Sequence, residues 1–382
     1  MTTAINTAVR LNMKAKTAEQ QQAIVQELQR QQASAHDFIV NESNLACIIP
    51  NEVEDGHIVR RQPGTWLNVP VFAEDVAAVR TNMKLGVGAE LQLFEKLGIP
   101  ARYGQRLRDE APLLLEGNLN YWFAYPQVVK EGTDNGPATY RRFQLRTLDN
   151  VIRAVLSPGY MALDSYDYLF RILQITQPKG GVVKEITLTD DRFTMFVVHE
   201  DWARDLEQHR GVMDHMVPGI LFQNSETGEG RLGAQLKWWK QSCGNGMTTE
   251  RIVARTHLGS QLPDGIISKE TRAKAAELVW SEVTDMVNAA FDEQRFEQDW
   301  QAIQGLAQQV LEQPNEAIEK FGKDNGISDE EKQQILNNML VGGDPTMWGL
   351  LNAVTLAAQQ QSSVDRQHQL EEAAGKLVLV HR

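Results

Sequence analysis

The chain has 382 residues, of which 42% are hydrophobic and 23% are charged, as is typical of a soluble globular protein. A chain of this length can bury a large core and is expected to form two or three structural units. No apolar run approaches the roughly 20 residues that span a bilayer, and the start lacks the apolar core of a signal peptide. We therefore expect a cytoplasmic protein. Its two cysteines are far apart, which argues against a disulfide framework or a zinc site.

The net charge of -12 argues against a simple electrostatic binder of nucleic acid, because such proteins neutralise phosphates with cations. The charge is unevenly distributed, however. Residues 140–257 carry fifteen Lys and Arg against fourteen Asp and Glu, and residues 231–257 carry five against one. The acidity therefore lies in the flanks, and the central third of the chain could still present a basic surface.

The N-terminal part of the chain is predicted to be rich in helices. Residues 17–32 are strong helix formers with a narrow apolar stripe of Ile24, Val25 and Leu28, which suggests an arm, an oligomer contact or a fraying surface helix. A second helical pattern ends at Gly98 and Pro100, and residues 98–123 predict two further short helices. We assign residues 1–80 to an N-terminal arm and irregular region.

Alternating patterns then predict β-hairpins. Residues 142–156 form one with its turn at 147–150, residues 184–201 a second with its turn at Asp190-Asp191, and residues 219–239 a third, followed by a strand at 250–256. A helix with Asp164 as its N-cap separates the first two hairpins. We assign residues 81–267 to an α+β core with β-hairpins.

From Ser268 the apolar spacing returns to the helical period. Residues 276–291 predict one face of a long helix that extends, with a break, toward Glu312, and the last fifteen residues predict a weak helix and a tail. Ser328 and Glu331 fit a capping box that opens one helix, and Asp344-Pro345 predict an N-cap and a first-turn proline for another. Residues 268–382 are assigned to a C-terminal helical region. The order predicts an α+β fold in which a central antiparallel sheet of β-hairpins is flanked by an N-terminal and a long C-terminal helical region.

The run GEGRLGAQLKWWK at residues 228–240 is the most distinctive motif. It matches GxGxxG, but the alternation that follows predicts a hairpin strand, whereas a dinucleotide-binding loop would open a helix. Arg231, Gln235, Lys237 and Trp239 share one side of that strand, and such a mixture of cations, amide and aromatic ring suits single-stranded nucleic acid. The alternative is a solvated outer face on which a helix covers Trp239.

Other predicted strands add cations to polar or mixed faces. If the strands share one sheet, the cations would bind phosphates while Trp239 stacks on a base for roughly 1–3 kcal/mol. The hypothesis requires the structure to gather these groups on one accessible surface that the acidic flanks do not cover. The predicted nucleic-acid-binding residues are Arg142, Arg146, Arg153, Arg231, Lys237, Trp239, Lys240, Arg251 and Arg255.

Motifs for catalysis or metal binding are missing from the sequence. The eight histidines form no HExxH motif or His/Asp cluster, and no GxxxxGK[ST] loop for ATP occurs. Cys243 and His257 could form a nucleophile pair, but nothing supplies the third group that would orient it, so structural roles are favoured. We expect no metal, no cofactor and no enzymatic activity.

Four segments occur together along the chain: RTLDNVIRAVLSPGY (146–160) with Leu163-Asp164, FQNSETGEGRLG (222–233), CGNGM (243–247) and MWGLLNAVT (347–355). Together they resemble the phage/plasmid-like proteins, a family of domain-of-unknown-function proteins found on mobile elements. Pro158-Gly159 departs from the polar residues expected before Tyr160. The resemblance implies no reaction.

A fainter similarity links the strands of residues 184–256 and the following helix to the RecT/Rad52-type single-strand annealing proteins. These proteins have a sheet backed by a helix and form rings or filaments on DNA.

The combined expectation is a nonenzymatic, oligomeric protein of a phage, prophage or plasmid that binds single-stranded nucleic acid. Such a protein would act in replication or recombination, with strand annealing as one role. The alternative is a structural or protein-interaction assembly protein of a mobile element, in which the acidic flanks and the Gln-rich arm drive assembly. A hydrolase that uses Cys243 and His257 is a third hypothesis.

Overall fold

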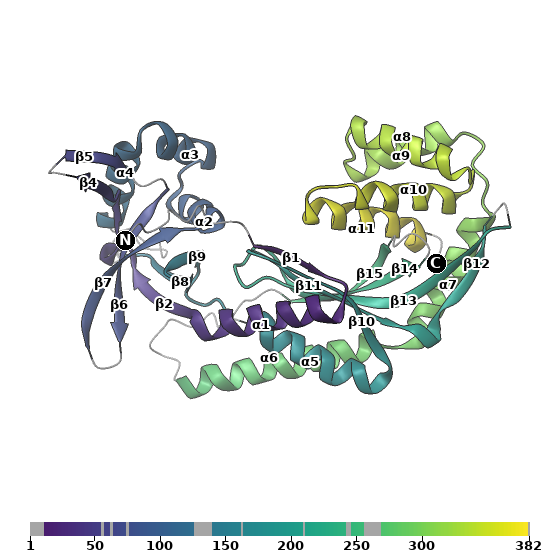
Figure 1. Ribbon diagram of the computed structural model, residues 1–382, viewed down its shortest axis with the longest axis horizontal. Coiled ribbons are helices and arrows are strands. Elements are labelled where there is room, and N and C mark those ends of the chain that lie inside the picture. Colours follow the sequence, from purple (N-terminus) through teal and green to yellow (C-terminus); the bar gives the residue numbers. More distant parts are fainter. Residues whose placement is uncertain are drawn as a thin grey trace, which may run out of the picture.

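The chain forms an α+β fold built on two separate sheets, which confirms the predicted class and adds a second sheet to it (Figure 1). The smaller sheet and three helices lie at one end of the molecule, and the larger sheet with the remaining helices lies at the other. The computed structural model describes residues 11–54, 57–61, 64–73, 76–125, 140–161, 163–208, 211–241, 246–255 and 269–380.

The larger sheet contains seven strands, and all of its pairs are antiparallel. The hairpins predicted around Asp190-Asp191 and residues 224–231 form its centre, so these two predictions are confirmed. The strands follow the order β1-β10-β11-β13-β14-β15, with β12 paired to β13. They are β1 (Asn12–Ala15), β10 (Gly181–Thr189), β11 (Phe193–His199), β12 (Arg204–Glu207), β13 (Met213–Asn224), β14 (Leu232–Lys240) and β15 (Gly246–Arg255).

The smaller sheet has the order β2-β8-β9-β7-β6-β3, with β7 and β9 parallel. The predicted hairpin of β8 and β9 is confirmed, and Asp149 and Asn150 turn it with positive φ angles of 51° and 61°. The same sheet takes β2, β3, β6 and β7 from the N-terminal part of the chain, so the expectation of an irregular region there is wrong, and a boundary at residue 80 would cut β7. The strands are β2 (Ala35–Asn41), β3 (Ala46–Ile48), β6 (Trp66–Ala73), β7 (Val76–Leu85), β8 (Arg142–Leu148) and β9 (Val151–Leu156), while β4 (Asn51–Glu54) and β5 (His57–Arg61) form a separate hairpin.

Helices α2 (Val87–Leu97), α3 (Ala101–Glu110) and α4 (Pro112–Ala124) share a core with the smaller sheet. Helices α1 (Ala18–Ser34), α5 (Ser165–Thr176) and α6 (Lys269–Ala290) run along one side of the larger sheet (Figure 1). Thr17 opens α1 with a capping box, and Ile24 and Leu28 are buried in the core of the larger sheet. The helix therefore packs against the body of the molecule and is not an extended arm.

The C-terminal region is helical, as predicted. It contains α7 (Glu293–Gln308), α8 (Pro314–Asn325), α9 (Asp329–Gly342), α10 (Met347–Gln359) and α11 (Val364–Val380), and short 3-10 turns occur at Glu42–Asn44, Gln177–Lys179 and Glu200–Trp202. The predicted break lies between α6 and α7, where Asp292 caps α7, and the capping box of Ser328 and Glu331 is confirmed. Thr346, rather than Asp344, is the N-cap of α10.

Helix α11 is longer than the weak helix and tail predicted for this segment. It lies on the opposite side of the larger sheet from α5 and α6 (Figure 1) and packs on β15. Gly375 permits this contact, because a Cβ atom there would lie 1.7 Å from the carbonyl oxygen of Thr248. This close approach places the acidic side chains of α11 over the middle of the sheet.

Candidate functional site

The nine predicted nucleic-acid-binding residues do not share one sheet. Arg142, Arg146 and Arg153 belong to β8 and β9 of the smaller sheet, whereas the other six lie in or next to β14 and β15 of the larger sheet. The single basic sheet face that the sequence suggested is therefore absent. Strand β8 pairs with β2, and β9 pairs in parallel with β7, so the first hairpin belongs to the N-terminal strands.

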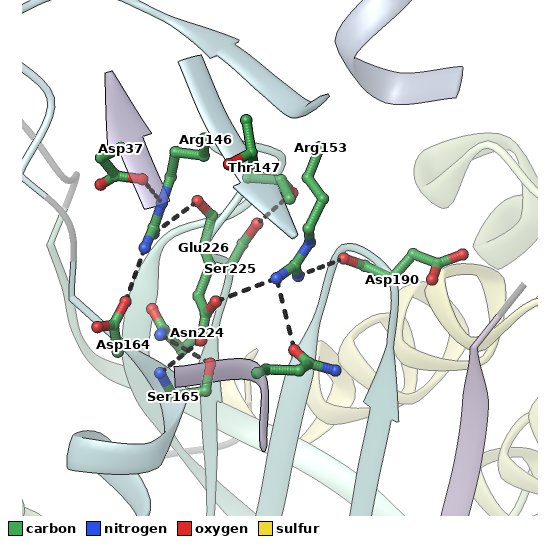
Figure 2. Close-up of polar contacts among 12 residues, drawn as sticks. Asp37, Arg146, Thr147, Arg153, Asp164, Ser165, Asp190, Asn224, Ser225 and Glu226 are labelled. Atoms are coloured by element: carbon green, nitrogen blue, oxygen red, sulfur yellow. Dashed lines mark hydrogen bonds and ion pairs between the residues drawn. The ribbon is translucent and has the colours of Figure 1, made fainter. Parts of the chain in front are cut away.

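Arg146 lies in a buried junction between the two sheets and exposes only 6% of its surface (Figure 2). Its guanidinium contacts Asp37 at 3.0 Å and Asp164 at 2.7 Å, and it donates to the carbonyl of Glu226 at 3.1 Å. Burial alone would lower the pKa of this guanidinium, but the carboxylates of Asp37, Asp164 and Glu226 raise it above its usual range. Arg146 is therefore a permanently charged structural residue, and the prediction that it faces nucleic acid is not supported by its position.

Arg153 belongs to the same junction. It donates to the carbonyl of Asp190 at 2.9 Å, and its guanidinium lies 3.5 Å from the Glu226 carboxylate and 3.4 Å from Gln31 Oε1 (Figure 2). The other Glu226 oxygen accepts from the backbone N–H of Ser165 at 2.7 Å, so Glu226 joins the start of α5 to both arginines. We call this group of contacts the inter-sheet network, because it connects α1, α5 and the two sheets.

Lys240 points to the other side of β14 from Lys237, because side chains alternate along a strand. Its ammonium lies 2.7 Å from the carboxylate of the buried Asp214, and Lys240 itself is half-buried. Arg142 is exposed, but it lies in the smaller sheet. The backbones of Arg251 and Arg255 lie in β15, which confirms the predicted strand, but their side chains are outside the described part of the structure. Cys243 and His257 also lie outside the described residues.

Three of the nine residues do come together. Arg231, Lys237 and Trp239 line two adjoining hollows between the larger sheet and α11, with volumes of about 370 and 300 Å³, that share His368. We call the two hollows together the basic groove. Its charged lining consists of six cations, Lys14, Lys16, Lys184, Arg192, Arg231 and Lys237, and three carboxylates, Glu185, Glu371 and Glu372. The groove is thus locally positive in a chain whose net charge is -12.

Lysines and aromatic rings are interleaved on the floor of the basic groove. Lys184 Nζ lies 5.6 Å from the centroid of the Trp239 ring, and Lys237 Nζ lies 5.4 Å from that of Phe196. Glycines on the neighbouring strands make room for this packing. A Cβ atom at Gly219 would lie 2.8 Å from the Phe196 ring, and one at Gly246 would lie 2.4 Å from Cε of Lys237.

Helix α11 covers part of this floor. Lys237 Nζ and the Glu371 carboxylate are 2.7 Å apart. Lys237 exposes only 9% of its surface and Glu371 only 2%. Burial alone would raise the pKa of Glu371. The nearby Lys237 and His368 outweigh burial, so the pKa of Glu371 is lowered. Gln235 donates to Glu372 at 2.7 Å. The helix therefore covers Gln235 and Lys237, which are buried and not solvated. Trp239, which the alternative placed under a helix, is half-buried and lines the groove.

The predicted binding residues did not include Lys14, Lys16, Lys184 or Arg192, which also line the groove. The side chains of Lys14 and Lys16 are 45% and 65% exposed and share Glu185 at 3.1 and 3.6 Å, and that of Lys184 is 27% exposed and pairs with Glu200 at 2.5 Å. Lys184 starts the second predicted hairpin, so the alternation along that strand could have identified it as a residue of the polar face. Lys14 reaches the groove only because β1 pairs with β10, a long-range contact.

The GxGxxG motif forms part of a hairpin turn. Gly228 has a φ of +80° in the segment between β13 and β14, and the strand β14 starts at Leu232. A helix does not follow the motif, so the phosphate-loop geometry is absent and the hairpin prediction is confirmed. On β14, Leu232, Ala234, Leu236 and Trp238 are buried in the core on the side opposite Lys237, as the alternation indicated.

No protein-family model, curated protein or solved structure matches the chain. In the part of the chain that the structure describes, no three His, Cys, Asp or Glu side chains are grouped so that they could hold a metal ion. Among the helices of that same part, none combines the length and apolar composition needed to cross a membrane. Cys47 is buried, and its burial raises the pKa of its thiol to about 12, so it is a structural cysteine.

Proposed function

We propose that the chain binds single-stranded nucleic acid in the basic groove. The observation that carries this proposal is the half-buried Trp239 ring, which has Lys184 at 5.6 Å and lines a groove with six cations and three carboxylates. Cations that follow phosphates and a ring that stacks on a base are the usual elements of single-strand binding. In this proposal the cations Lys14, Lys16, Lys184 and Arg231 contact phosphates, and Trp239 stacks on one base.

A single strand fits this arrangement better than a duplex. The bases of a duplex are stacked on their neighbours, so the face of the Trp239 ring can stack only on a base that has left the stack. The larger sheet forms the floor of the groove, and α11 lies over one part of it. The phosphate contacts would therefore follow a narrow path between the sheet and α11. We propose no catalytic step. A role in replication or recombination of a mobile element, including strand annealing, rests on the sequence resemblances.

The test is fluorescence anisotropy with a labelled single-stranded oligonucleotide at about 50 mM and about 200 mM salt. Trp239→Ala is expected to cost about 1–3 kcal/mol of binding free energy, because one stacked base is lost. Lys184→Gln is expected to reduce the salt dependence of log K by about 0.7, the value of one phosphate contact on a single strand.

A matched control is Lys179→Gln, since Lys179 lies outside the groove and contacts Asn288 on α6. We expect it to bind like the wild type. Absence of binding at low salt, or wild-type binding by a Lys184→Gln/Trp239→Ala double variant, would contradict the proposal. The first result would favour the assembly role instead.

A further inference from the structure

The two hollows of the basic groove differ in their chemistry. The hollow of about 370 Å³ is lined by both arginines of the groove, Arg192 and Arg231, and we call it the arginine hollow. The hollow of about 300 Å³ is lined by the four lysines and by the rings of Phe196 and Trp239. Among the described residues, no Trp, Tyr or Phe lines the arginine hollow. The lysine-lined hollow can therefore stack a base, whereas the arginine hollow offers mainly charged and hydrogen-bonding groups.

The arginine hollow is suited to a phosphate group. Arg192 belongs to the turn between β10 and β11, and Arg231 to the turn between β13 and β14. The two turns meet at one end of the larger sheet because β11 pairs with β13 in antiparallel fashion. A guanidinium binds phosphate through two parallel hydrogen bonds, which an ammonium cannot form. One carboxylate, that of Glu372, also lines the hollow and accepts from Gln235 at 2.7 Å, so the two guanidiniums leave the lining positive.

The floor of the groove ends at the arginine hollow. Gln92 of α2 donates to the carbonyl of Thr227 and to the carboxylate of Glu229, both at 2.8 Å. A Cβ atom at Gly88 would lie 3.7 Å from a carboxylate oxygen of Asp191 and equally far from one of Glu229. Helix α2 thus lies against both turns (Figure 1). Beyond the hollow a strand would meet α2 and two exposed carboxylates, which repel phosphates, so its last favourable contact lies in the hollow.

The end of a strand differs chemically from its interior. An internal phosphodiester carries one negative charge, whereas a terminal phosphate monoester carries about −1.5 to −2 charges at pH 7 and has three acceptor oxygens. We infer that the arginine hollow binds a terminal phosphate of the single strand through Arg192 and Arg231, while a base farther along the strand stacks on Trp239. The inference rests on the proposed function and names the strand end that the groove prefers. Either the 5′ or the 3′ end can supply this phosphate.

The experiment compares three short single strands of one sequence. One carries a 5′-phosphate, one a 3′-phosphate, and one has hydroxyl groups at both ends. Each competes, unlabelled, with an internally labelled strand in an anisotropy assay with the full chain. At least one phosphorylated strand is expected to bind about fivefold more tightly than the hydroxyl strand at about 0.1 M salt, the effect of one further phosphate contact. The phosphorylated strand that gains affinity identifies the end that enters the hollow.

Matched variants separate end recognition from general electrostatic attraction. Arg192→Gln/Arg231→Gln should abolish the preference for the phosphorylated strand. Lys14→Gln/Lys16→Gln should weaken all three strands alike and keep the preference, because these lysines line only the other hollow. Arg231 is exposed, so Arg231→Gln alone should keep the fold, as circular dichroism would show, and reduce the preference.

The possible failures of the two proposals are distinguishable. Equal binding of the three strands by the wild type would overturn the inference and leave single-strand binding in the groove intact. A preference that persists in folded Arg192→Gln/Arg231→Gln or Arg231→Gln protein would also overturn it. Absence of binding by any strand at low salt would overturn both the inference and the proposed function.

Discussion

Replacement of Glu371 by Gln should affect the stability of the chain and its binding of nucleic acid in opposite directions. The Glu371 carboxylate lies 2.7 Å from Lys237 Nζ, and both groups are buried between α11 and β14. Removal of one member of a buried ion pair costs up to about 3–5 kcal/mol, because the other charge loses its partner. Since Gln keeps an oxygen that can accept from Lys237, we expect a loss of about 2–3 kcal/mol in the free energy of unfolding.

The same substitution removes one of the three carboxylates that line the basic groove. The amide that replaces the carboxylate can still accept from Lys237 but is neutral, so the charge of Lys237 would be free to attract a phosphate in the groove. One additional phosphate contact on a single strand steepens the dependence of log K on log salt by about 0.7, which corresponds to about fivefold tighter binding at about 0.1 M salt. A less stable protein that binds more tightly is the expected result.

Urea unfolding followed by tryptophan fluorescence gives the first quantity, and anisotropy across a salt series gives the second. Glu319→Gln serves as the control, because this carboxylate is 67% exposed and pairs with Lys332 far from the groove. The control should change neither quantity measurably. If folded Glu371→Gln protein binds single strands no better than the wild type, with the same salt dependence, the assignment of Lys237 to the binding surface is refuted.

Four further outcomes are expected. Arg146→Met removes a buried guanidinium from the exposed Asp37 and the half-buried Asp164 and Glu226, so its hydrogen bonds to these residues are lost. The free energy of unfolding should fall by about 1.5–3 kcal/mol in urea titrations, and a loss near zero would contradict that structural role. The Arg366 guanidinium lowers the pKa of Glu331 to about 2, so the stabilisation is complete above the unfolded value of about 4.3 and is lost as the pH falls from there toward 2. Glu331→Gln should flatten this part of the stability curve, and equal acid sensitivity of both proteins would show that the pair is unimportant. Cys47, with a pKa of about 12, should not react with a thiol reagent until the chain unfolds, and rapid labelling of the native protein at this position would show that it is accessible. Gly375→Ala should lower the melting temperature, because its Cβ would lie 1.7 Å from a carbonyl oxygen of β15, and an unchanged melting temperature would contradict the close packing of α11.

Local patterns predicted the three hairpins of residues 142–156, 184–201 and 219–239 and most helices, but not the β4–β5 and β6–β7 hairpins. The alternation along residues 232–239 correctly separated the core side, with Leu236 and Trp238, from the side that carries Lys237 and Trp239. Ser328 and Glu331 marked the start of α9 because a capping box depends only on residues three positions apart. These signals are short-range, so a single sequence contains them.

The placement of the hairpins in sheets could not be predicted in the same way. Arg146 and Lys237 have similar surroundings in the sequence, but one lies in the inter-sheet network and the other in the basic groove. The difference arises from long-range strand pairing, such as that of β8 with β2. This pairing brings Arg146 to Asp37, a residue more than 100 positions away in the sequence. Residues 35–85 were also missed as strands, because Pro70 and short polar segments interrupt their alternation.

The packing of α11 over the larger sheet could not be predicted from the sequence for a related reason. Its buried residues include Leu370, Ala373, Ala374 and Val378, which make a small apolar stripe that predicts only a weak helix. The stripe suffices because Gly375 lets the helix approach β15 closely. The resulting contact between Glu371 and Lys237 joins residues 134 positions apart, so it is evident only in the folded chain.

The most direct test of single-strand binding in the basic groove is to locate the contact by photo-cross-linking. A single-stranded oligonucleotide with photoreactive bases is irradiated with the full chain, and the modified residues are identified by mass spectrometry. Binding in the basic groove predicts cross-links at Trp239 and in the segments that contain Lys184 and Lys14, and the loss of these cross-links as salt is raised. Cross-links confined to other surfaces, such as the tyrosines of α4, or none at low salt would contradict it.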